Sequence, residues 1–231
     1  MFTIEDIHVY ILNWKKVNEN SLRLYNAIRP IVNHTTIINC DEHWPLDSSI
    51  QHIQLDDSCY YGAQFNTAIK HIPEGGIMCI IVGDNNCEND FSTIFTSALK
   101  VFNTNKIGVY APRDKRSTVQ KVIHRYYGSL YHVKNTDCGF WFIHPTIYTP
   151  MKTLDYTISK YGWGIDVIMI KEAIRHGMRV VCDTSIETDQ LDHECGYNRD
   201  IASKEYIAML QAYNVIRKPI SSLSTIFGRR F

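Results

Sequence analysis

The sequence lacks the features that would place it in a membrane or in a secretory pathway. No apolar run approaches the roughly 20 residues that a membrane-spanning helix requires. The opening stretch, MFTIEDIHVYILNWKK, has neither a basic leader nor a long apolar region. Low-complexity runs and internal repeats are also missing. We therefore expect a soluble, cytoplasmic protein with a folded core.

Net charge is absent as well, because 24 Lys and Arg residues balance 24 Asp and Glu residues. Such a chain has no overall field to attract nucleic acid or an anionic membrane. Charge is nevertheless uneven along the chain. Residues 183–200 contain six acids against Arg199 alone, whereas residues 214–231 contain four bases and no acid. We interpret 183–200 as an acidic surface loop and 214–231 as a basic tail.

The cysteines form no C-x-x-C pair and no zinc-like cluster. There are seven of them, and several lie in or next to apolar stretches, at positions 40, 59, 79, 87, 138, 182 and 195. An odd number in such surroundings indicates reduced, buried thiols rather than a disulfide framework.

The sequence does contain an alternation of apolar strand patterns and amphipathic helix patterns. This alternation predicts an α/β fold, a single Rossmann-like domain over residues 1–200 with a mostly parallel central sheet flanked by helices. A C-terminal helix and the basic tail follow at 201–231. Strands are expected at 7–12, 35–39, 50–55, 77–82, 106–110, 130–133, 136–145 and 179–182. Helices are expected at 18–30 with Asn18 or Asn20 as the cap, at 60–71, at 91–102, within 114–129, from 161–166 to Gly177, and at 201–215.

The stretch Ile77–Asp90 is the clearest candidate for a site. Six apolar residues read as a buried strand that runs into a polar turn, Gly83-Asp84-Asn85-Asn86. Ligands of open α/β sheets bind at the carboxyl ends of strands. Asp84 and Asn86 could offer oxygen ligands to a divalent cation there. The alternative is an ordinary polar turn.

Polar residues also follow other predicted strands. Asn13 and Asp41 come at the ends of the first two strands, where either residue could equally serve as a cap or a turn residue. Asp166 falls at the start of a predicted helix, behind Gly162-Trp163-Gly164. An acid in that position either stabilises the helix through its dipole or acts as a general base.

The order of these elements resembles the GT-A glycosyltransferases. The likeness is to the nucleotide-sugar enzymes of family 2 and to the related galactosyltransferase and polypeptide-GalNAc-transferase groups. HVYILNWKKVNE is similar to their first strand and donor loop, and IINCDEHW to their second strand, which ends in an acid. YYGAQFNTAIKHIPEGGIMCIIVGDN resembles the stretch that leads into the D-x-D motif.

The second half of the chain carries the rest of the resemblance, which spans about residues 6–198. YGWGIDVIMIKEAIRHGMRVV resembles the GWG-x-(E/D)-D segment, whose acid at the helix start is the base of inverting members. His193, before Gly196-Tyr197, resembles the downstream histidine that completes the metal site in several such families.

The resemblance implies an inverting glycosyltransferase that takes a sugar from a nucleotide diphosphate, with a UDP-sugar favoured. It implies a nucleotide-sugar half at about 1–110, an acceptor half at about 111–200, Mn²⁺ or Mg²⁺ as the metal, and Asp166 as the catalytic base. The implied donor-binding residues are Leu12, Asn13, Asp41, Tyr61, Asn66, Gly83, Asp84 and Asn85, with Gln64 beside them in the same helix start. The implied metal ligands are Asp84, Asn86 and His193, and the implied acceptor-binding residues are Gly139, Trp141, Trp163 and Gly164.

The sequence departs from the family pattern at two points. Amides stand at Asn85 and Asn86 where carboxylates are usual, which puts metal dependence in doubt, and Ile165 stands where many relatives carry another acid. One alternative is therefore an inactive nucleotide- or glycan-binding module of the same fold. A second is a nucleotidylyltransferase, although that activity needs a glycine-rich first loop and residues 12–15 contain no glycine.

Other features keep two interpretations. Trp141, beside Phe140, is either a core residue or part of an acceptor platform. The acidic loop is either plain surface or a lid over the donor. The basic tail is either a disordered end or a contact for the diphosphate or for a polyanionic acceptor. The acceptor would be a saccharide or another hydroxyl compound, including a modified nucleobase in DNA if the enzyme is viral or from a phage.

Overall fold

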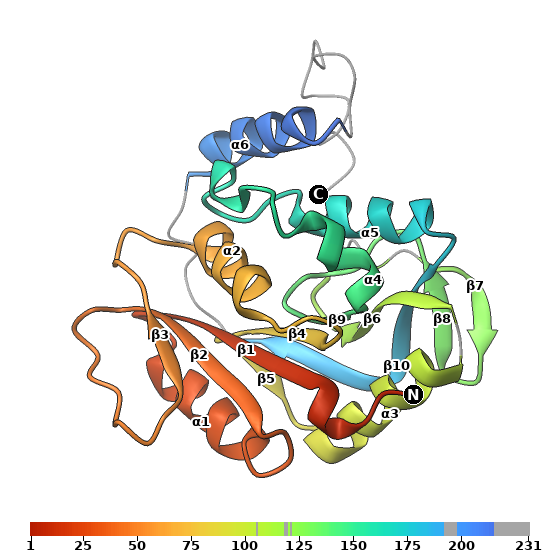
Figure 1. Ribbon diagram of the computed structural model, residues 1–231, viewed down its shortest axis with the longest axis horizontal. Coiled ribbons are helices and arrows are strands. Elements are labelled where there is room, and N and C mark those ends of the chain that lie inside the picture. The colour runs from red at the N-terminus through yellow and green to blue at the C-terminus, as the bar shows by residue number, and fades with distance from the viewer. Residues whose placement is uncertain (105, 118–119, 121, 192–197, 215–231) are drawn as a thin grey trace.

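The computed structural model describes residues 1–104, 106–117, 120, 122–191 and 198–214 (Figure 1). These residues form one sheet of ten strands in the order β3-β2-β1-β4-β9-β6-β10-β8-β7, with β5 paired to β10. The strands are β1 Ile7–Trp14, β2 His34–Cys40, β3 His52–Gln54, β4 Ile77–Val82, β5 Asn85–Cys87, β6 Ile107–Asp114, β7 Val122–Tyr127, β8 Leu130–Val133, β9 Phe140–Ile143 and β10 Arg179–Gln190.

Most of the sheet is parallel, as the sequence predicts. Strand β1 pairs in parallel with β2 and β4, β2 with β3, and β6 with β10. Strand β9 is antiparallel to both β4 and β6, so β4 and β6 point the same way. The carboxyl ends of β1, β2, β4, β6 and β10 therefore meet at one edge of the sheet, where the amino end of β9 also lies.

Helices cover both faces of the sheet (Figure 1). One core contains the apolar sides of α1 and α3, and the other contains those of α2, α4, α5 and α6. The helices are α1 Asn18–Ile28, α2 Tyr61–His71, α3 Phe91–Thr104, α4 Pro145–Tyr148, α5 Ile165–Arg175 and α6 Arg199–Ala212. Short 3₁₀ helices are η1 Ile4–Asp6, η2 Thr149–Met151 and η3 Tyr156–Ile158.

The central strands show why their sequences are apolar without alternation. In β1, Val9 and Ile11 pack in the core under α1 and α3, while Tyr10 and Leu12 pack in the opposite core. Successive strand residues point to opposite faces. Because both faces are covered by helices, both sets of side chains must be apolar.

The helix predicted within 114–129 is wrong. Strand β6 continues to Asp114, and Val122–Tyr127 forms β7, which pairs antiparallel with β8. The segment VIHRYY is rich in β-branched and aromatic residues, which favour strands. Gly128 adopts a φ of 56° in the connection between β7 and β8, a conformation that glycine adopts without strain.

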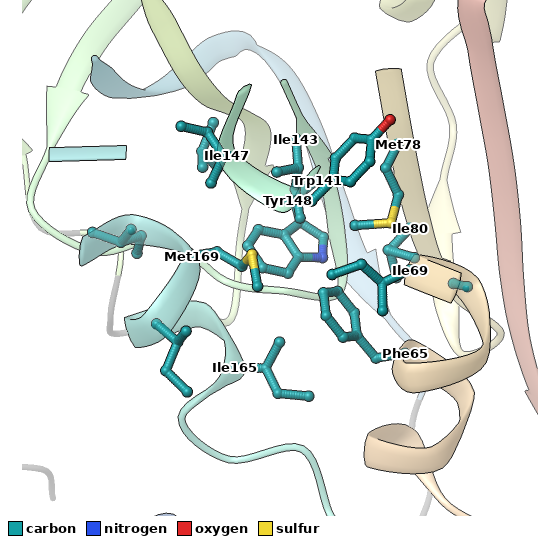
Figure 2. Close-up of a cluster of buried hydrophobic side chains, with 14 of the residues drawn as sticks. Phe65, Ile69, Met78, Ile80, Trp141, Ile143, Ile147, Tyr148, Ile165 and Met169 are labelled. Carbon is teal, nitrogen blue, oxygen red and sulfur yellow. The ribbon is translucent and has the colours of Figure 1, made fainter. Parts of the chain in front are cut away.

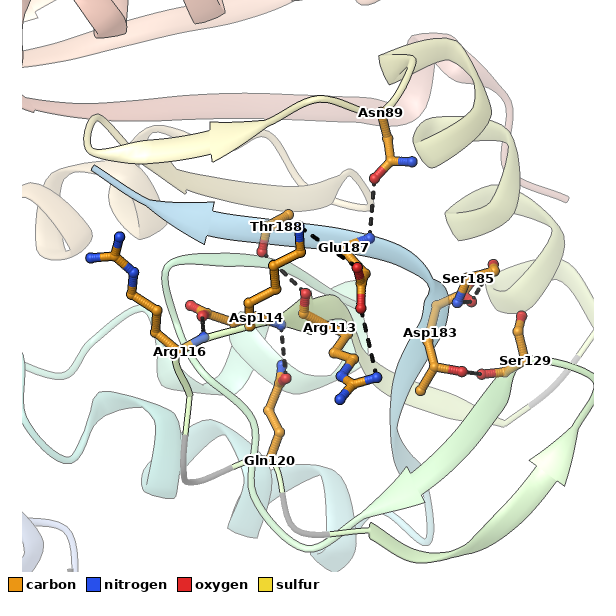
Figure 3. Close-up of polar contacts among 12 residues, drawn as sticks. Asn89, Arg113, Asp114, Arg116, Gln120, Ser129, Asp183, Ser185, Glu187 and Thr188 are labelled. Carbon is orange, nitrogen blue, oxygen red and sulfur yellow. Dashed lines mark hydrogen bonds and ion pairs between the residues drawn. The ribbon is translucent and has the colours of Figure 1, made fainter. Parts of the chain in front are cut away.

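The predicted acidic loop at 183–200 is also wrong over its first part, because β10 extends to Gln190 rather than ending at Cys182. Two of its acids form ion pairs with bases at the end of β6 or just after it, and Figure 3 shows those of Glu187. Glu187 lies 3.6 Å from Arg113 and 3.7 Å from Lys115, and Asp189 lies 2.7 Å from Arg116. The lid predicted for the same loop, 183–200, is therefore strand over its first part, and residues 192–197 of it lie outside the described residues. Most of the predicted basic tail, 215–231, also lies outside them.

Two smaller predictions also need correction. Asn85–Cys87 is a strand rather than part of a loop, and it pairs antiparallel with the end of β10. Helix α1 begins after Val17 without a side-chain cap, so neither Asn18 nor Asn20 caps it. None of the helices in the described ranges is both long and apolar enough to cross a bilayer.

Candidate functional site

A network of buried amides ties together the carboxyl ends of β1 and β2. The side-chain nitrogen of Asn13 donates to Asn39 Oδ1 at 2.7 Å and to Asn18 Oδ1 at 2.8 Å. Asn18 in turn donates to Asp41 Oδ2 at 2.7 Å, and the backbone N–H of His43 donates to Asp41 Oδ1 at 3.0 Å. Asn13 and Asp41, predicted separately from two strand ends, therefore lie in one connected polar cluster.

Gln64, from the first turns of α2, fastens this cluster to the helix. Its side-chain nitrogen donates to the backbone carbonyls of Asn13 at 2.7 Å and Ile38 at 3.0 Å. Gln64 is only 2% exposed. It therefore bridges β1 and β2 from within the protein and holds Asn13 in place.

We expect Gln64→Leu to destabilise the protein by about 1–3 kcal/mol, because two buried carbonyls lose their donor. The change should appear in chemical denaturation as a lower midpoint with an unchanged slope. Gln211→Leu, at an exposed position of α6, is the matched control and should change stability by no more than about 0.5 kcal/mol. Equal stability of the two variants would show that the bridge contributes nothing.

The turn after β4 is pressed against β1 and α1, and glycine is required there. A Cβ added at Gly83 would lie 2.3 Å from Ser21 Oγ and 2.9 Å from the carbonyl oxygen of Leu12. The N–H of Gly83 donates to that same Leu12 carbonyl at 2.8 Å. Asn20 donates to the carbonyls of Gly83 at 2.6 Å and Asn85 at 2.9 Å. These hydrogen bonds therefore hold the predicted donor residues Leu12, Gly83 and Asn85 close to one another.

Asp84 and its neighbours lie where β4, β5 and the end of β10 meet. Asp84 is 8% exposed, and its carbonyl accepts a hydrogen bond from the N–H of Leu191 at 2.8 Å. Asn85 is buried, and neither side-chain polar atom has a hydrogen-bond partner. Asn86 pairs in register with Asp189 and lines a cavity of about 510 Å³ with residues of β10.

Of the predicted metal ligands Asp84, Asn86 and His193, only Asp84 provides a carboxylate. No group of three or more His, Cys, Asp or Glu residues within the described ranges is arranged to hold a metal ion. The predicted ligand His193 lies outside those ranges. Asp84 nevertheless fits a hard cation of the Mg²⁺ kind, which is commonly bound by one or two carboxylates together with substrate phosphates and water.

The segment before α5 packs closely on the start of α2. Gly162 and Gly164 have positive φ angles of 79° and 96°, which favour glycine. A Cβ at Gly162 would lie 2.2 Å from the ring of Tyr61, so no other residue fits without displacement. Gly164 is the N-cap of α5, and Asp166 stands in the first helical turn, partly exposed.

Tyr61 links this segment to the turn before β9. Its hydroxyl donates to the carbonyl of Cys138 at 3.0 Å, and Val82 at the end of β4 donates to the carbonyl of Gly139 at 2.8 Å. Burial raises the pKa values of the Tyr61 hydroxyl and the Cys138 thiol, and the negative charge of Asp166 adds to both increases. Because Gly162 packs on Tyr61 and Tyr61 bonds to Cys138, the segment that leads into α5 lies near the turn that carries Gly139.

Three polar residues of this edge were not predicted from the sequence. Gln190, at the end of β10, donates to Asp114 Oδ2 at 2.9 Å. Asp137 Oδ1 accepts from the N–H of Gly139 at 2.8 Å. Burial and the nearby charge of Asp114 raise the pKa of Asp137. Gln190 and Asp114 could have been located if the last strand had been predicted to continue past Cys182, because position 190 then lies at the same edge as position 114.

Comparisons with known proteins give matches in structure but none in sequence. No family model and no curated protein matches the sequence. A structure of GalNAc-T7 with UDP, GalNAc and Mn²⁺ matches with a TM-score of 0.65 and 8% identity, over 89% of this chain and 48% of that chain. The mannosyltransferase PcManGT from Pyrobaculum calidifontis, in complex with GDP-Man and Mn²⁺, matches with a TM-score of 0.60 and 10% identity, over 92% and 65%.

The chain has the GT-A fold. It spans about half the length of GalNAc-T7 and about two thirds of that of PcManGT. The inositol-1-phosphate CTP transferase from T. maritima also shares the architecture, with a TM-score of 0.51 and 12% identity over 88% of this chain and 97% of that chain. The same fold therefore occurs in proteins whose names describe two different reactions, mannosyl transfer and CTP transfer.

The carboxyl edge of this GT-A sheet gathers most of the predicted site residues. Contacts connect Leu12, Asn13 and Asp41 on one side with Gly83, Asp84 and Asn85 in the middle. Tyr61, Gly139 and the start of α5 complete the other side. Asn66 is placed differently, because its side-chain oxygen accepts from the N–H of Tyr156 at 3.4 Å, beside η3.

Trp141 belongs to the core of this fold rather than to its surface (Figure 2). The side chain has no exposure to solvent, and its ring centroid lies 6.1 Å from that of Phe65. It is surrounded by apolar residues of α2, β4 and α5, among them Ile80 and Met169. It offers no face on which an acceptor could stack. Trp163, which is partly exposed, is the tryptophan of the predicted acceptor set that remains accessible.

Proposed function

We propose that the chain is a glycosyltransferase that moves a sugar from a nucleotide diphosphate to an acceptor hydroxyl. One observation carries this proposal. Asp166 stands in the first turn of α5, and the glycine segment before it packs on Tyr61, whose hydroxyl donates to the carbonyl of Cys138 in the turn before β9. A carboxylate is thereby placed beside the strand-end turns that would hold a donor. GalNAc-T7 and PcManGT, which share the fold, have structures with a nucleotide or a nucleotide sugar bound.

The donor would lie along the edge from Asp41 to Asp84. We place the base and the ribose beside the polar cluster at the ends of β1 and β2, where the side-chain oxygen of Asn13 has no hydrogen-bond partner among the described residues. The turn at Gly83 packs tightly against β1 and α1, and we place the diphosphate beside this turn, at Asp84. A UDP-sugar is the donor class that we favour.

A divalent cation, Mn²⁺ or Mg²⁺, would supply Lewis-acid neutralisation of the leaving diphosphate when bound. Asp84 would hold it together with the phosphate oxygens, and Asn86 and His193 are the further ligands that we propose. The chain's own part is to fix Asp84, through the hydrogen bond from Leu191 N–H to the Asp84 carbonyl and through the packing of Gly83.

On the acceptor side, Asp166 would accept the proton from the attacking hydroxyl as general base. We propose an inverting reaction, in which Asp166 acts on the acceptor hydroxyl while Asp84 acts on the donor diphosphate. Gly139 and Gly164 would let backbone approach the substrate closely, and Trp163 would contact a saccharide face. A hydroxylated base in DNA is an acceptor class to include in the search.

Nucleotidyl transfer is the second candidate, because the T. maritima CTP transferase has a similar architecture. The loop that would have to grip a triphosphate argues against it. Residues 12–15 contain no glycine, and Asn13 is engaged in the amide network. Incorporation of label from a nucleoside triphosphate into a sugar phosphate would establish this activity in place of glycosyl transfer.

The test of the proposed function is a thermal-shift screen of nucleotides and nucleotide sugars, each with Mn²⁺ or with EDTA. A ligand present at 100 times its Kd should stabilise the protein by about 2.7 kcal/mol. Hydrolysis or transfer of the sugar from the best ligand then shows turnover. Binding without turnover would favour the inactive binding module, and silence across all nucleotides would overturn the donor site.

Asp84→Asn should weaken donor binding about tenfold or more in Mn²⁺ and change it little in EDTA, because a carboxylate ligand is lost while shape is kept. Isothermal titration with the best nucleotide sugar measures both affinities. Glu88→Gln, an exposed carboxylate in the same turn region, is the control and should bind like the parent. Equal affinity of Asp84→Asn and parent in Mn²⁺ would remove Asp84 from the site.

A further inference from the structure

Strand β7 is an open edge of the sheet. Figure 1 shows it at the outer margin, and among the described strands it pairs only with β8. The opposite edge of the sheet, β3, has three residues, whereas β7 has six. A strand of that length presents a row of backbone donors and acceptors to any extended chain that reaches it.

The side chains of β7 are unusually exposed and apolar for such an edge. Val122 is 54% exposed, Ile123 52% and Tyr127 74%. Soluble proteins commonly protect long edges with charges, prolines, bulges or very short strands. Strand β7 contains one charged residue, Arg125, and two irregularities in its pairing with β8, and it contains no proline. Three large apolar side chains within one exposed strand are instead a feature of interaction surfaces.

The exposed charges on the β7–β8 hairpin are basic. Residues 115–136 contain five Lys and Arg and no Asp or Glu. Two of these bases, Lys115 and Arg116, are paired with Glu187 and Asp189. We therefore do not count them among the charges that are available to a partner. Arg125 and Lys134 are exposed on the hairpin, and the guanidinium of Arg179 lies 4.6 Å from the centre of the Tyr126 ring.

We propose that β7 is a docking edge for an extended acidic polypeptide segment, which adds to the sheet as a further strand and places its carboxylates against Arg125, Lys134 and Arg179. Strand addition uses the backbone row for affinity and side-chain contacts for selection. The exposed valine and isoleucine match apolar residues that alternate with the acids. The basic surface disfavours a second copy of this hairpin and equally disfavours the basic segment 214–231 of the chain itself.

The site does not depend on glycosyl transfer, because it involves neither Asp84 nor Asp166. A cavity of about 380 Å³ extends from β7 toward the carboxyl ends of the central strands. Its lining includes Val122, Tyr131 and Asp114. Asp114 is also the carboxylate that accepts from Gln190 at the candidate site. A peptide on β7 would therefore lie next to the carboxyl edge of the sheet.

The test uses the full chain and three fluorescent probes of similar length. These are a peptide of alternating glutamate and valine, a peptide of alternating lysine and valine, and an oligothymidylate. We expect anisotropy to show binding of the acidic peptide alone, weakened by added salt. Hydrogen exchange should show slower exchange of β7 amides in its presence, because those groups become paired.

The double variant Arg125→Glu/Lys134→Glu should weaken the acidic peptide by about tenfold or more, and Lys100→Glu on α3, an exposed lysine, should not. Lys134→Glu alone serves if the double variant fails to fold, as judged by circular dichroism. Tighter binding of oligothymidylate than of the peptide would overturn the proposal in favour of a nucleic-acid surface. Self-association that protects β7 without peptide, or no peptide binding at all, would also overturn it.

Discussion

Replacing Asp166 by Asn should lower the rate of sugar transfer by about 10²- to 10⁴-fold, the usual contribution of a general base. The amide cannot accept the proton of the attacking hydroxyl, although it occupies nearly the same volume. Donor binding should stay within about twofold of the parent, because the donor contacts that we propose are made by other residues, Asn13, Asp41 and Asp84. Single-turnover transfer and donor titration, measured on the same preparations, separate the two effects.

Asp200→Asn is the matched control for this experiment. Asp200 also lies in the first turn of a helix, α6, so its replacement removes the same favourable interaction with a helix dipole. Both variants should lose only about 0.3–1 kcal/mol of stability from that cause. A transfer rate for Asp166→Asn close to that of Asp200→Asn would mean that Asp166 is a helix-stabilising residue and not the base.

The sheet was largely predictable because its physical signals are local. Buried parallel strands read as apolar runs that end in polar residues, and helix patterns separate several of them. Strand β8 was predicted at 130–133, whereas its partner β7 was missed because that strand is exposed on both sides and VIHRYY shows no alternation of apolar and polar residues. Its strand propensity and the glycine at 128 were the available signals.

The candidate site was predictable only where its residues directly follow a buried strand. Asn13, Asp41 and Asp84 do so, and they lie at one edge because parallel strands end together. Gln190 and Asp114 were missed because the β-bulge between Asp183 and Glu187 hides the continuation of β10 behind charged residues. Those charges are neutralised by Arg113 and Lys115 across the sheet, a pairing that sequence spacing does not reveal.

The roles of Asn18 and Asn20 show a different kind of error. Asparagine before a helical pattern is a common N-cap, and the sequence offers no reason to prefer another role. In the folded chain Asn18 donates to Asp41, and Asn20 donates to the carbonyls of Gly83 and Asn85. The first turn of α1 therefore bonds to two strand-end turns, one at Asp41 and one at Gly83–Asn85, which are 42 or more residues apart in sequence.

Replacing Trp141 by Ala should destabilise the protein by about 3–5 kcal/mol, the usual cost of removing a fully buried large aromatic side chain. The loss combines the transfer free energy of the indole with the cavity left between Phe65, Ile80 and Met169. Urea denaturation gives the stability, and transfer measured well below the midpoint of unfolding gives the activity of the folded fraction.

Trp163→Ala is the informative partner of that experiment, since Trp163 is partly exposed and Trp141 is not. Its stability should fall by much less, about 1 kcal/mol, while its KM for a saccharide acceptor should rise because a stacking face is lost. The opposite pattern, a stable Trp141→Ala protein with a raised acceptor KM, would show that Trp141 contributes to acceptor binding. Because the two tryptophans differ mainly in exposure, the pair of measurements separates a contribution to the core from a contribution to binding.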